Sequence, residues 1–365
     1  MIRLRYGSQQ RFRFRYRDVT LPGHVDAPMP LRSATYRLDD GPPVRFYVEE
    51  LSEPPGLDWR FGYKPSPARL RLPHRGDFNI EIPVTSLAPQ AGSHRVAIDL
   101  EDAAGGRAHA DVAFTWDPTP VSLPLDLTDL SKVTNIQQVG QVVNGAFDLD
   151  PGRSAVRARA PVAPDALLLL GAPSGSQEAT YDVVFSEPDT AKYLGLSDFF
   201  VGHEEEDPPL GIKPGWSTAG LATLTYGWRP GSPAEVGQRP AEPVPGSRPE
   251  GQARAWLACS DNSRRRERWL VKTDPPARVG VEAGVRYRVR HQVLFEEGVN
   301  RVRFRIWPAG DREPASWLCE IDDAGAPSEH RRFSAASFGL FQHTGRPTEW
   351  SSIRVVALGR GGNPA

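Results

Sequence analysis

The chain has 365 residues, which is longer than one typical domain and suits two domains with separate hydrophobic cores. Lys and Arg number 44 against 45 Asp and Glu, so the formal net charge is −1. Because no field of one sign covers such a molecule, we expect no nucleic-acid partner and no attraction to an anionic membrane. Proline (36 residues) and glycine (34 residues) separate apolar runs rich in Val, Phe, Tyr and Trp. This composition is typical of many short strands joined by turns.

The N-terminal sequence MIRLRYGSQQRFRFRYRDV alternates apolar and basic residues. It lacks the uninterrupted apolar segment of a signal peptide, and no stretch approaches the roughly 18 apolar residues of a membrane helix. We therefore expect no membrane insertion, and either a protein that is not exported by this route or a trimmed chain. The compartment and the oligomeric state do not follow from the sequence.

The chain has two cysteines, Cys259 and Cys319, each inside a strand-like run. One buried disulfide and two free thiols are both compatible with this pattern, but a disulfide framework is not. We expect free, buried thiols, the usual state of unpaired cysteine in a protein core.

Period-two alternation dominates residues 1–119. The segment ATYRLDDGPPVRFYVEE places two strands around the turn residues 39–43, and residues 94–100 and 108–116 flank a second turn at 102–106. Asp117-Pro118-Thr119-Pro120 then ends this block, so we place a domain boundary between residues 119 and 120. The spacing of strands and turns predicts a β-sandwich.

The motifs GSHRVAIDLEDAAGG and TYRLDDGPP give residues 1–119 a resemblance to a known class of module. They are similar to hairpins of the bacterial immunoglobulin-like or fibronectin-like domains that are appended to surface and carbohydrate-active proteins. The resemblance implies an immunoglobulin-like β-sandwich as the N-terminal domain.

Residues 120–365 contain a long series of strand-like runs and no segment with convincing helical periodicity. A Pro- and Gly-rich stretch at 229–252 has almost no bulky apolar residue, and we interpret it as a long exposed loop between two strands of one sheet. WPAGDREPASW at 307–317 and FGLFQH at 338–343 resemble the C-terminal part of concanavalin A-like, laminin G-like jelly rolls. The predicted fold is thus all-β: an immunoglobulin-like β-sandwich followed by a concanavalin-like jelly roll.

A polar and aromatic cluster near residue 200 is a candidate site in this second domain. Asp198 and His203 provide acid–base groups of the kind that glycoside hydrolysis uses. Trp216, Tyr226 and Trp228 follow in the sequence and suit stacking against sugar rings. The alternative is a solvated acidic turn beside ordinary strand residues.

A second group of candidates lies nearer the C-terminus. In VRYRVRHQV, period two places Tyr287, Val289 and His291 on one face and the arginines, including Arg288, on the other. An arginine row facing a groove would suit an acidic polysaccharide, although such rows are more often simply solvated. Gln342 and His343 lie at the loop after a strand and are candidates for ligand binding and for acid–base catalysis.

The resemblance to jelly rolls implies a concave face that accepts an extended glycan, so binding of an oligo- or polysaccharide is our leading functional hypothesis. The alternative is a glycoside hydrolase or polysaccharide lyase, with Asp198, His203, His291 or His343 as acid and base. A structural or assembly protein of a surface or virion is a further alternative. No cofactor is expected to be required, and the resemblance is compatible with a structural calcium ion whose ligands are not local in sequence.

Overall fold

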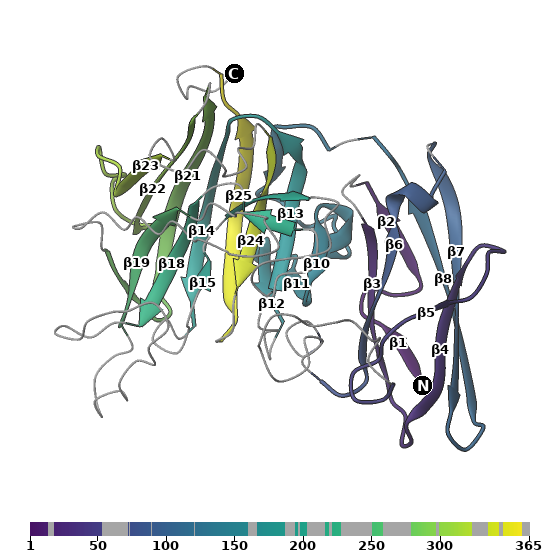
Figure 1. Ribbon diagram of the computed structural model, residues 1–365. Helices are drawn as coiled ribbons and strands as arrows, with labels where there is room; N and C mark the ends of the chain where they lie inside the picture. Colours follow the sequence, from purple (N-terminus) through teal and green to yellow (C-terminus); the bar gives the residue numbers. More distant parts are fainter. Residues whose placement is uncertain are drawn as a thin grey trace, which may run out of the picture.

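The computed structural model describes residues 1–13, 18–52, 72, 74–88, 90–119, 121–159, 166–186, 279–296, 299–322, 335–342 and 346–359, and the backbone of 194–195, 198–202, 216–218, 221–227 and 250–257. These residues form 25 strands in five sheets and two short 3-10 turns, with no α-helix among them (Figure 1). In the same part of the chain, no helix is long and apolar enough to cross a membrane. The all-β prediction is confirmed.

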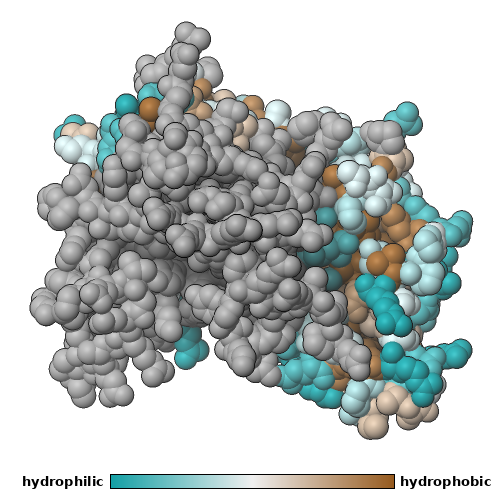
Figure 2. Space-filling view, in the orientation of Figure 1, coloured by the Kyte–Doolittle hydropathy of each residue, from teal (hydrophilic) through white to brown (hydrophobic). Residues whose placement is uncertain are grey.

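Two sheets form the N-terminal part of the molecule. The first has the order β1 (Ile2–Leu4), β3 (Asp18–Val25), β6 (Asp77–Pro83), and the second has the order β2 (Gln9–Phe12), β8 (Arg107–Trp116), β7 (Gly92–Asp102), β4 (Leu31–Leu38), β5 (Val44–Arg45). Strand β2 runs parallel to β8, and the other pairs are antiparallel. Alternate residues of both sheets meet in one buried apolar cluster, which includes Leu21, Ile80 and Phe114. On the surface of this part, hydrophilic and apolar residues are interleaved (Figure 2).

The hairpin predicted around residues 102–106 is present. Strands β7 and β8 pair in register from Gly92 opposite Trp116 to Glu101 opposite Arg107. At the turn, Asp102 Oδ1 accepts hydrogen bonds from the amides of Ala104 and Gly106, and Gly105 has a φ of 87°. The hairpin prediction is confirmed because turn chemistry and alternation agree here.

Three sheets form the C-terminal part. An eight-stranded sheet has the order β11 (Phe147–Asp150), β12 (Ala155–Ala158), β25 (Thr348–Ala357), β14 (Gln177–Phe185), β21 (Arg286–Glu296), β22 (Val299–Pro308), β23 (Cys319–Asp322), with β9 (Leu125–Leu127) also on β25. A five-stranded sheet has the order β10 (Gln141–Asn144), β13 (Ala166–Ser174), β24 (Ala336–Gln342), β16 (Asp198–Gly202), β17 (Trp216–Thr218). The third sheet has the order β15 (Leu194–Gly195), β18 (Leu221–Gly227), β19 (Glu250–Leu257), β20 (Val279–Glu282).

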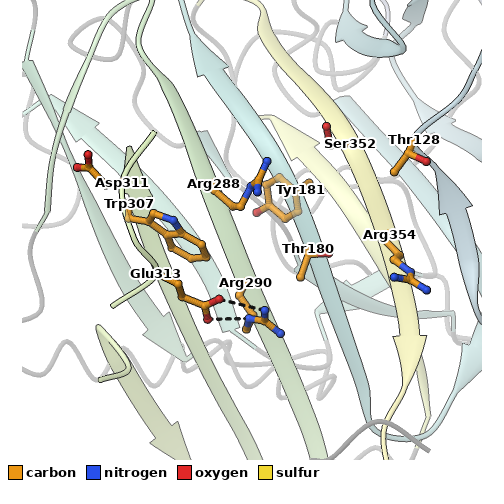
Figure 3. A pocket seen from close by; sticks show the side chains of 10 residues that line it. All are labelled: Thr128, Thr180, Tyr181, Arg288, Arg290, Trp307, Asp311, Glu313, Ser352 and Arg354. Carbon is orange, nitrogen blue, oxygen red and sulfur yellow. Dashed lines mark hydrogen bonds and ion pairs between the residues drawn. The ribbon is translucent and has the colours of Figure 1, made fainter. Parts of the chain in front are cut away.

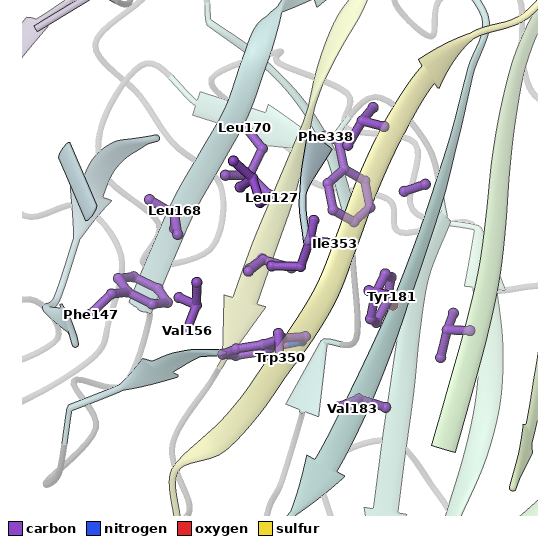
Figure 4. Packing of buried hydrophobic residues seen from close by; sticks show 14 of the residues in the cluster. Leu127, Phe147, Val156, Leu168, Leu170, Tyr181, Val183, Phe338, Trp350 and Ile353 are labelled. Atoms are coloured by element: carbon purple, nitrogen blue, oxygen red, sulfur yellow. The ribbon is translucent and has the colours of Figure 1, made fainter. Parts of the chain in front are cut away.

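The main core of this part lies between the eight-stranded and five-stranded sheets. Trp350 and Tyr181 from the first and Phe338 and Leu168 from the second are fully or almost fully buried in one cluster (Figure 4). Packing of this kind is what period-two alternation predicts for a sandwich, since one face of each sheet must be covered. Packed antiparallel sheets agree with the predicted fold class, whereas the immunoglobulin-like and concanavalin-like assignments and the boundary at 119/120 stay predictions.

Buried hydrogen bonds join residues of the N-terminal part to residues that follow position 135. The Tyr6 hydroxyl donates to the carbonyl of Phe147 (3.1 Å) and accepts from its amide (2.9 Å). Gln137, in the 3-10 turn Ile136–Gln138, donates to the side chain of Gln10 (2.9 Å) and to the carbonyl of Thr20 (3.2 Å). These bonds fix the two parts against each other, because buried polar atoms that separate would lose their partners.

Candidate functional site

A hollow of about 380 Å³ opens on the outer face of the eight-stranded sheet, the face turned away from the core (Figure 3). Strands β14, β21, β22 and β25 supply most of its walls. Its lining residues are Thr128, Thr180, Tyr181, Arg288, Arg290, Trp307, Asp311, Glu313, Ser352 and Arg354. A volume of this size is within the range of about 300–1,000 Å³ that is usual for small-molecule sites.

Strand register explains why there is a hollow at this point. Thr180 on β14 lies opposite Arg354 on β25 and opposite Arg290 on β21, and Arg290 in turn lies opposite Arg305 on β22. Residues in such a cross-strand row share one face of the sheet. Threonine is much shorter than arginine, so the side chain of Thr180 extends less far from the sheet than those of Arg354 and Arg290 on either side. The hollow lies over Thr180.

A β-bulge in β25 shapes the edge of the hollow. Thr180 to Asp182 on β14 are matched by Ser351 to Arg354 on β25, so β25 has one extra residue. Ser352 within this segment has a φ of 53°, in the left-handed region that non-glycine residues rarely adopt. Bulges re-aim side chains and are frequent beside functional sites, and left-handed non-glycine residues also concentrate there.

Ion pairs hold the arginines of the sheet in fixed positions. Arg288 donates to both carboxylate oxygens of Asp182, from Nε at 2.8 Å and from a terminal nitrogen at 3.2 Å. These hydrogen bonds raise the pKa of Arg288 above its ordinary value. Arg290 binds Glu313 through two nitrogens (2.8 and 3.1 Å) and Glu178 through the third (2.6 Å). Forked, two-point contacts of this kind orient a guanidinium more strictly than a single bond does.

The network continues away from the hollow along β21 and β22. Glu313 also accepts from Arg305 (2.6 Å), and Gln292 joins Glu178 to Arg303. The guanidinium carbons of Arg303 and Arg305 lie 4.6 and 4.0 Å from the ring centre of Trp317, which is cation–π geometry. The loop that carries Glu313 and Trp317 is thereby attached to the sheet, and the hollow has a rigid wall on this side.

The predicted candidates fall in different places. Arg288 lines the hollow. His291, on the opposite face of the same strand, is 0% exposed, and its ring contacts Phe304 in the core. Burial lowers the pKa of His291 to about 3. Gln342 is also 0% exposed; it donates to the carbonyl of Arg346 (2.7 Å) and accepts from the amide of Thr348 (3.0 Å). His291 and Gln342 therefore contribute nothing to the hollow.

The remaining candidates are described by their backbone or not at all. Asp198 lies on β16 opposite Gly339, and Trp216 lies on β17 opposite Gly202, so both belong to the five-stranded sheet. Tyr226 lies on β18 of the four-stranded sheet, opposite Gln252. Their side chains, together with His203, Trp228, His343 and both cysteine thiols, are outside the described residues. Residues 229–249 of the loop predicted at 229–252 are outside them too, and the last three residues of that range belong to β19.

Several residues of the hollow were not singled out by sequence reasoning, above all Thr180, Ser352 and Arg354. The alternation in VRYRVR does identify the face that carries Arg288 and Arg290. By contrast, β9, β14 and β25 are distant in sequence from β21, and nothing local indicates that they pair. For metals, the described residues contain no group of three or more His, Cys, Asp or Glu side chains placed to hold an ion, and the calcium expectation stays untested.

No protein-family model matches the chain, and no curated protein matches it either. Solved structures similar to it include one of the carbohydrate-binding modules from the β-sandwich superfamily studied for promiscuous specificity (8% identity, 94% of each chain covered, TM-score 0.17). A second is a candidate carbohydrate-binding protein from Bacteroides ovatus (9% identity, 99% of this chain and 83% of that chain covered, TM-score 0.23). A third is the secreted serine protease VesC from Vibrio cholerae (9% identity, 96% of this chain and 50% of that chain covered, TM-score 0.18). TM-scores of this size carry no argument about fold or function.

Proposed function

We propose that the chain binds carbohydrate in the hollow on the outer face of the eight-stranded sheet. The observation that carries the proposal is the lining itself: guanidinium donors, carboxylate acceptors and hydroxyl groups gathered beside Trp307 on a rigid sheet. Sugar hydroxyls both donate and accept hydrogen bonds, so a site for them needs both kinds of partner at fixed positions. In this proposal the N-terminal sandwich is immunoglobulin-like and the C-terminal part is a concanavalin-like jelly roll.

The ion pairs support binding because they reduce the cost of ordering. Long side chains such as arginine lose rotamer freedom when a ligand immobilises them, at roughly 0.5–1.5 kcal/mol each. Arg288 and Arg290 are already held by Asp182, Glu178 and Glu313 before any ligand arrives. A glycan would thus meet a preorganised surface.

The enzymatic alternative, a glycoside hydrolase or polysaccharide lyase, needs an acid and a base that reach one sugar. Asp182 and Glu178, which do not line the hollow, are each bound to an arginine and are only 5% and 8% exposed, so they are poorly placed to touch a substrate. Of the two acids that line the hollow, Glu313 is paired with Arg290 and Arg305, whereas Asp311 is exposed. In this alternative, Asp198, His203 and His343 are the remaining candidates for the acid and the base. The third alternative, an assembly protein, would have a large exposed apolar patch. Among the described residues, the large hydrophobic side chains that are exposed are Met1, Met29 and Val44.

Incubation of the full chain with a panel of immobilised neutral and acidic polysaccharides tests the proposal. Retention on at least one glycan without release of reducing ends or unsaturated products is the expected result. Retention with products would instead support the enzymatic alternative. Passage through every column without retention would overturn carbohydrate binding.

A further inference from the structure

We propose that the hollow selects an anionic sugar and that Arg354, with the hydroxyls of Thr180 and Ser352, binds the carboxylate of a uronic acid residue. The inference rests on the proposed function, because it names the class of carbohydrate that the same site would take. Three observations carry it: which arginines are already neutralised, how the acids are buried, and what surrounds Arg354.

The arginines of the hollow differ in their partners. Arg288 and Arg290 are each bound by carboxylates at hydrogen-bonding distance. Arg354 has one acidic neighbour in the described part of the chain, Asp126, with 3.9 Å between Arg354 Nε and Asp126 Oδ2. Asp126 lies opposite Arg354 on β9, and its other oxygen accepts from the amide (3.0 Å) and hydroxyl (2.6 Å) of Thr128, so Arg354 has only the long contact to Oδ2. Arg354 is thus the cation of the hollow that is least satisfied by its neighbours.

Burial differs among the charged groups of this face. The carboxylates of Asp182 and Glu178 are almost inaccessible, whereas the side chains of Arg288 and Arg354 are 47% and 58% exposed. A ligand over the hollow would meet these two guanidinium groups directly. Exposed acids also lie on this face, namely Asp126 (52%), Glu313 (30%) and Asp311, but Glu313 is bound by Arg290 and Arg305.

Unused hydroxyls lie beside Arg354. Thr180 is its direct cross-strand neighbour, and Ser352 is brought to the same hollow by the bulge. Within the described residues neither side chain has a hydrogen bond to the protein, so both hydroxyls are available to donate to an anion. The guanidinium fork matches the two oxygens of a carboxylate, and such charge-assisted pairs are about twice as strong as neutral hydrogen bonds.

The row also fixes the size of the bound group. Arg354 and Arg290 are two strand spacings apart, or roughly 9–10 Å, with Thr180 between them. An anionic ring seated over Thr180 would direct its carboxylate toward Arg354 while its hydroxyls face the Arg290 and Glu313 pair. Net attraction comes from Arg354 because Arg290 is already paired.

The test measures affinity of the full chain for three polysaccharides that contain uronic acids, polygalacturonate, alginate and hyaluronan, each compared with its methyl-esterified form. Esterification removes the charge and keeps the sugar backbone. We expect at least one acid form to bind roughly tenfold or more tightly than its ester, as loss of one charge-assisted contact implies. Arg354→Gln should remove this preference, so that the acid form binds about as weakly as its ester.

Arg157→Gln is the matched control. Arg157 is an exposed residue of β12 in the same sheet, opposite Glu349 and outside the hollow, so this change removes an equal charge elsewhere. If Arg354→Gln and Arg157→Gln lost equal affinity for the acid form, the net charge of the protein would explain the effect, and the inference would be overturned. Equal binding of acid and ester forms would also overturn it while leaving carbohydrate binding intact, and a preference for sulfated galactan over every uronate would contradict the carboxylate assignment. If no glycan bound at all, the proposed function itself would fail.

Discussion

The Tyr6 hydroxyl binds both backbone groups of Phe147, accepting from its amide at 2.9 Å and donating to its carbonyl at 3.1 Å, across 141 residues of sequence. Tyr6, which follows β1 in the N-terminal part, thus contacts Phe147, the first residue of β11 in the eight-stranded sheet. Gln10, Thr20 and Gln137 form a second contact of the same kind. The two parts of the chain are therefore joined by buried polar bonds, whose loss leaves backbone groups without partners.

Tyr6→Phe should destabilise the protein. The ring and its packing are kept, but the Phe147 amide loses its acceptor in a buried position, which costs about 1–3 kcal/mol. Urea unfolding followed by tryptophan fluorescence measures this change. Tyr36→Phe is the control, because the Tyr36 hydroxyl makes one long bond of 3.4 Å to the Glu81 carbonyl. Equal stability of Tyr6→Phe and wild type would show that the contact does not join the parts in solution.

Alkaline pH should reduce the stability that the buried Tyr6 hydroxyl contributes. Burial raises the pKa of Tyr6 from its ordinary value of 10.0 to about 12. The unfolded chain then loses this proton more readily than the folded protein, so the stabilisation is complete below about pH 10 and decreases as the pH rises toward 12. A shift of this size corresponds to about 2–3 kcal/mol. Comparison of wild type with Tyr6→Phe between about pH 9 and pH 11 isolates the contribution; parallel stability curves for the two proteins would refute it.

Acid should destabilise the core around His291. Burial lowers the pKa of this imidazole from 6.5 to about 3. Between these two pH values the imidazole is protonated in the unfolded chain and neutral in the folded protein. Its contribution to stability is complete above pH 6.5 and falls by about 1.4 kcal/mol for each pH unit below it. His291→Gln removes the titrating group and keeps a polar side chain of similar size. Unfolding at about pH 7 and pH 5 should show a smaller acid loss in the variant than in wild type, and an identical loss would argue against a buried neutral imidazole.

The sequence predicts the fold class and the faces of individual strands, but not how the strands assemble. Turn residues and alternation near Asp102 predicted the β7–β8 hairpin because its two strands are adjacent along the chain. Alternation likewise separated His291 from Arg288, and the structure confirms that they lie on opposite faces. What alternation does not tell is which face lines a groove, and His291, considered as a catalytic group, lies in the core.

The hollow depends on pairings between distant segments. Thr180 becomes the floor of the hollow because Arg354 and Arg290 lie on either side of it, and these residues are 174 and 110 positions away. The bulge at Ser352 has no signature in SSIRVV, since serine is not a residue that favours positive φ. Long-range register and backbone irregularity of this kind are not encoded by local pattern, and this is why most residues of the hollow, apart from Arg288, were not predicted.

The central claim is that the hollow over Thr180 is where a glycan binds. Thr180→Tyr fills this space with a side chain that strands accept well, and Thr115→Tyr places the same side chain on an exposed strand position of β8, away from the hollow. The decisive measurement is the affinity of both variants and wild type for the polysaccharide that retains wild type, by affinity electrophoresis. Loss of binding of roughly tenfold or more in Thr180→Tyr alone, about 1.4 kcal/mol, is the predicted result. Undiminished binding by a folded Thr180→Tyr protein would place the glycan elsewhere and contradict the account.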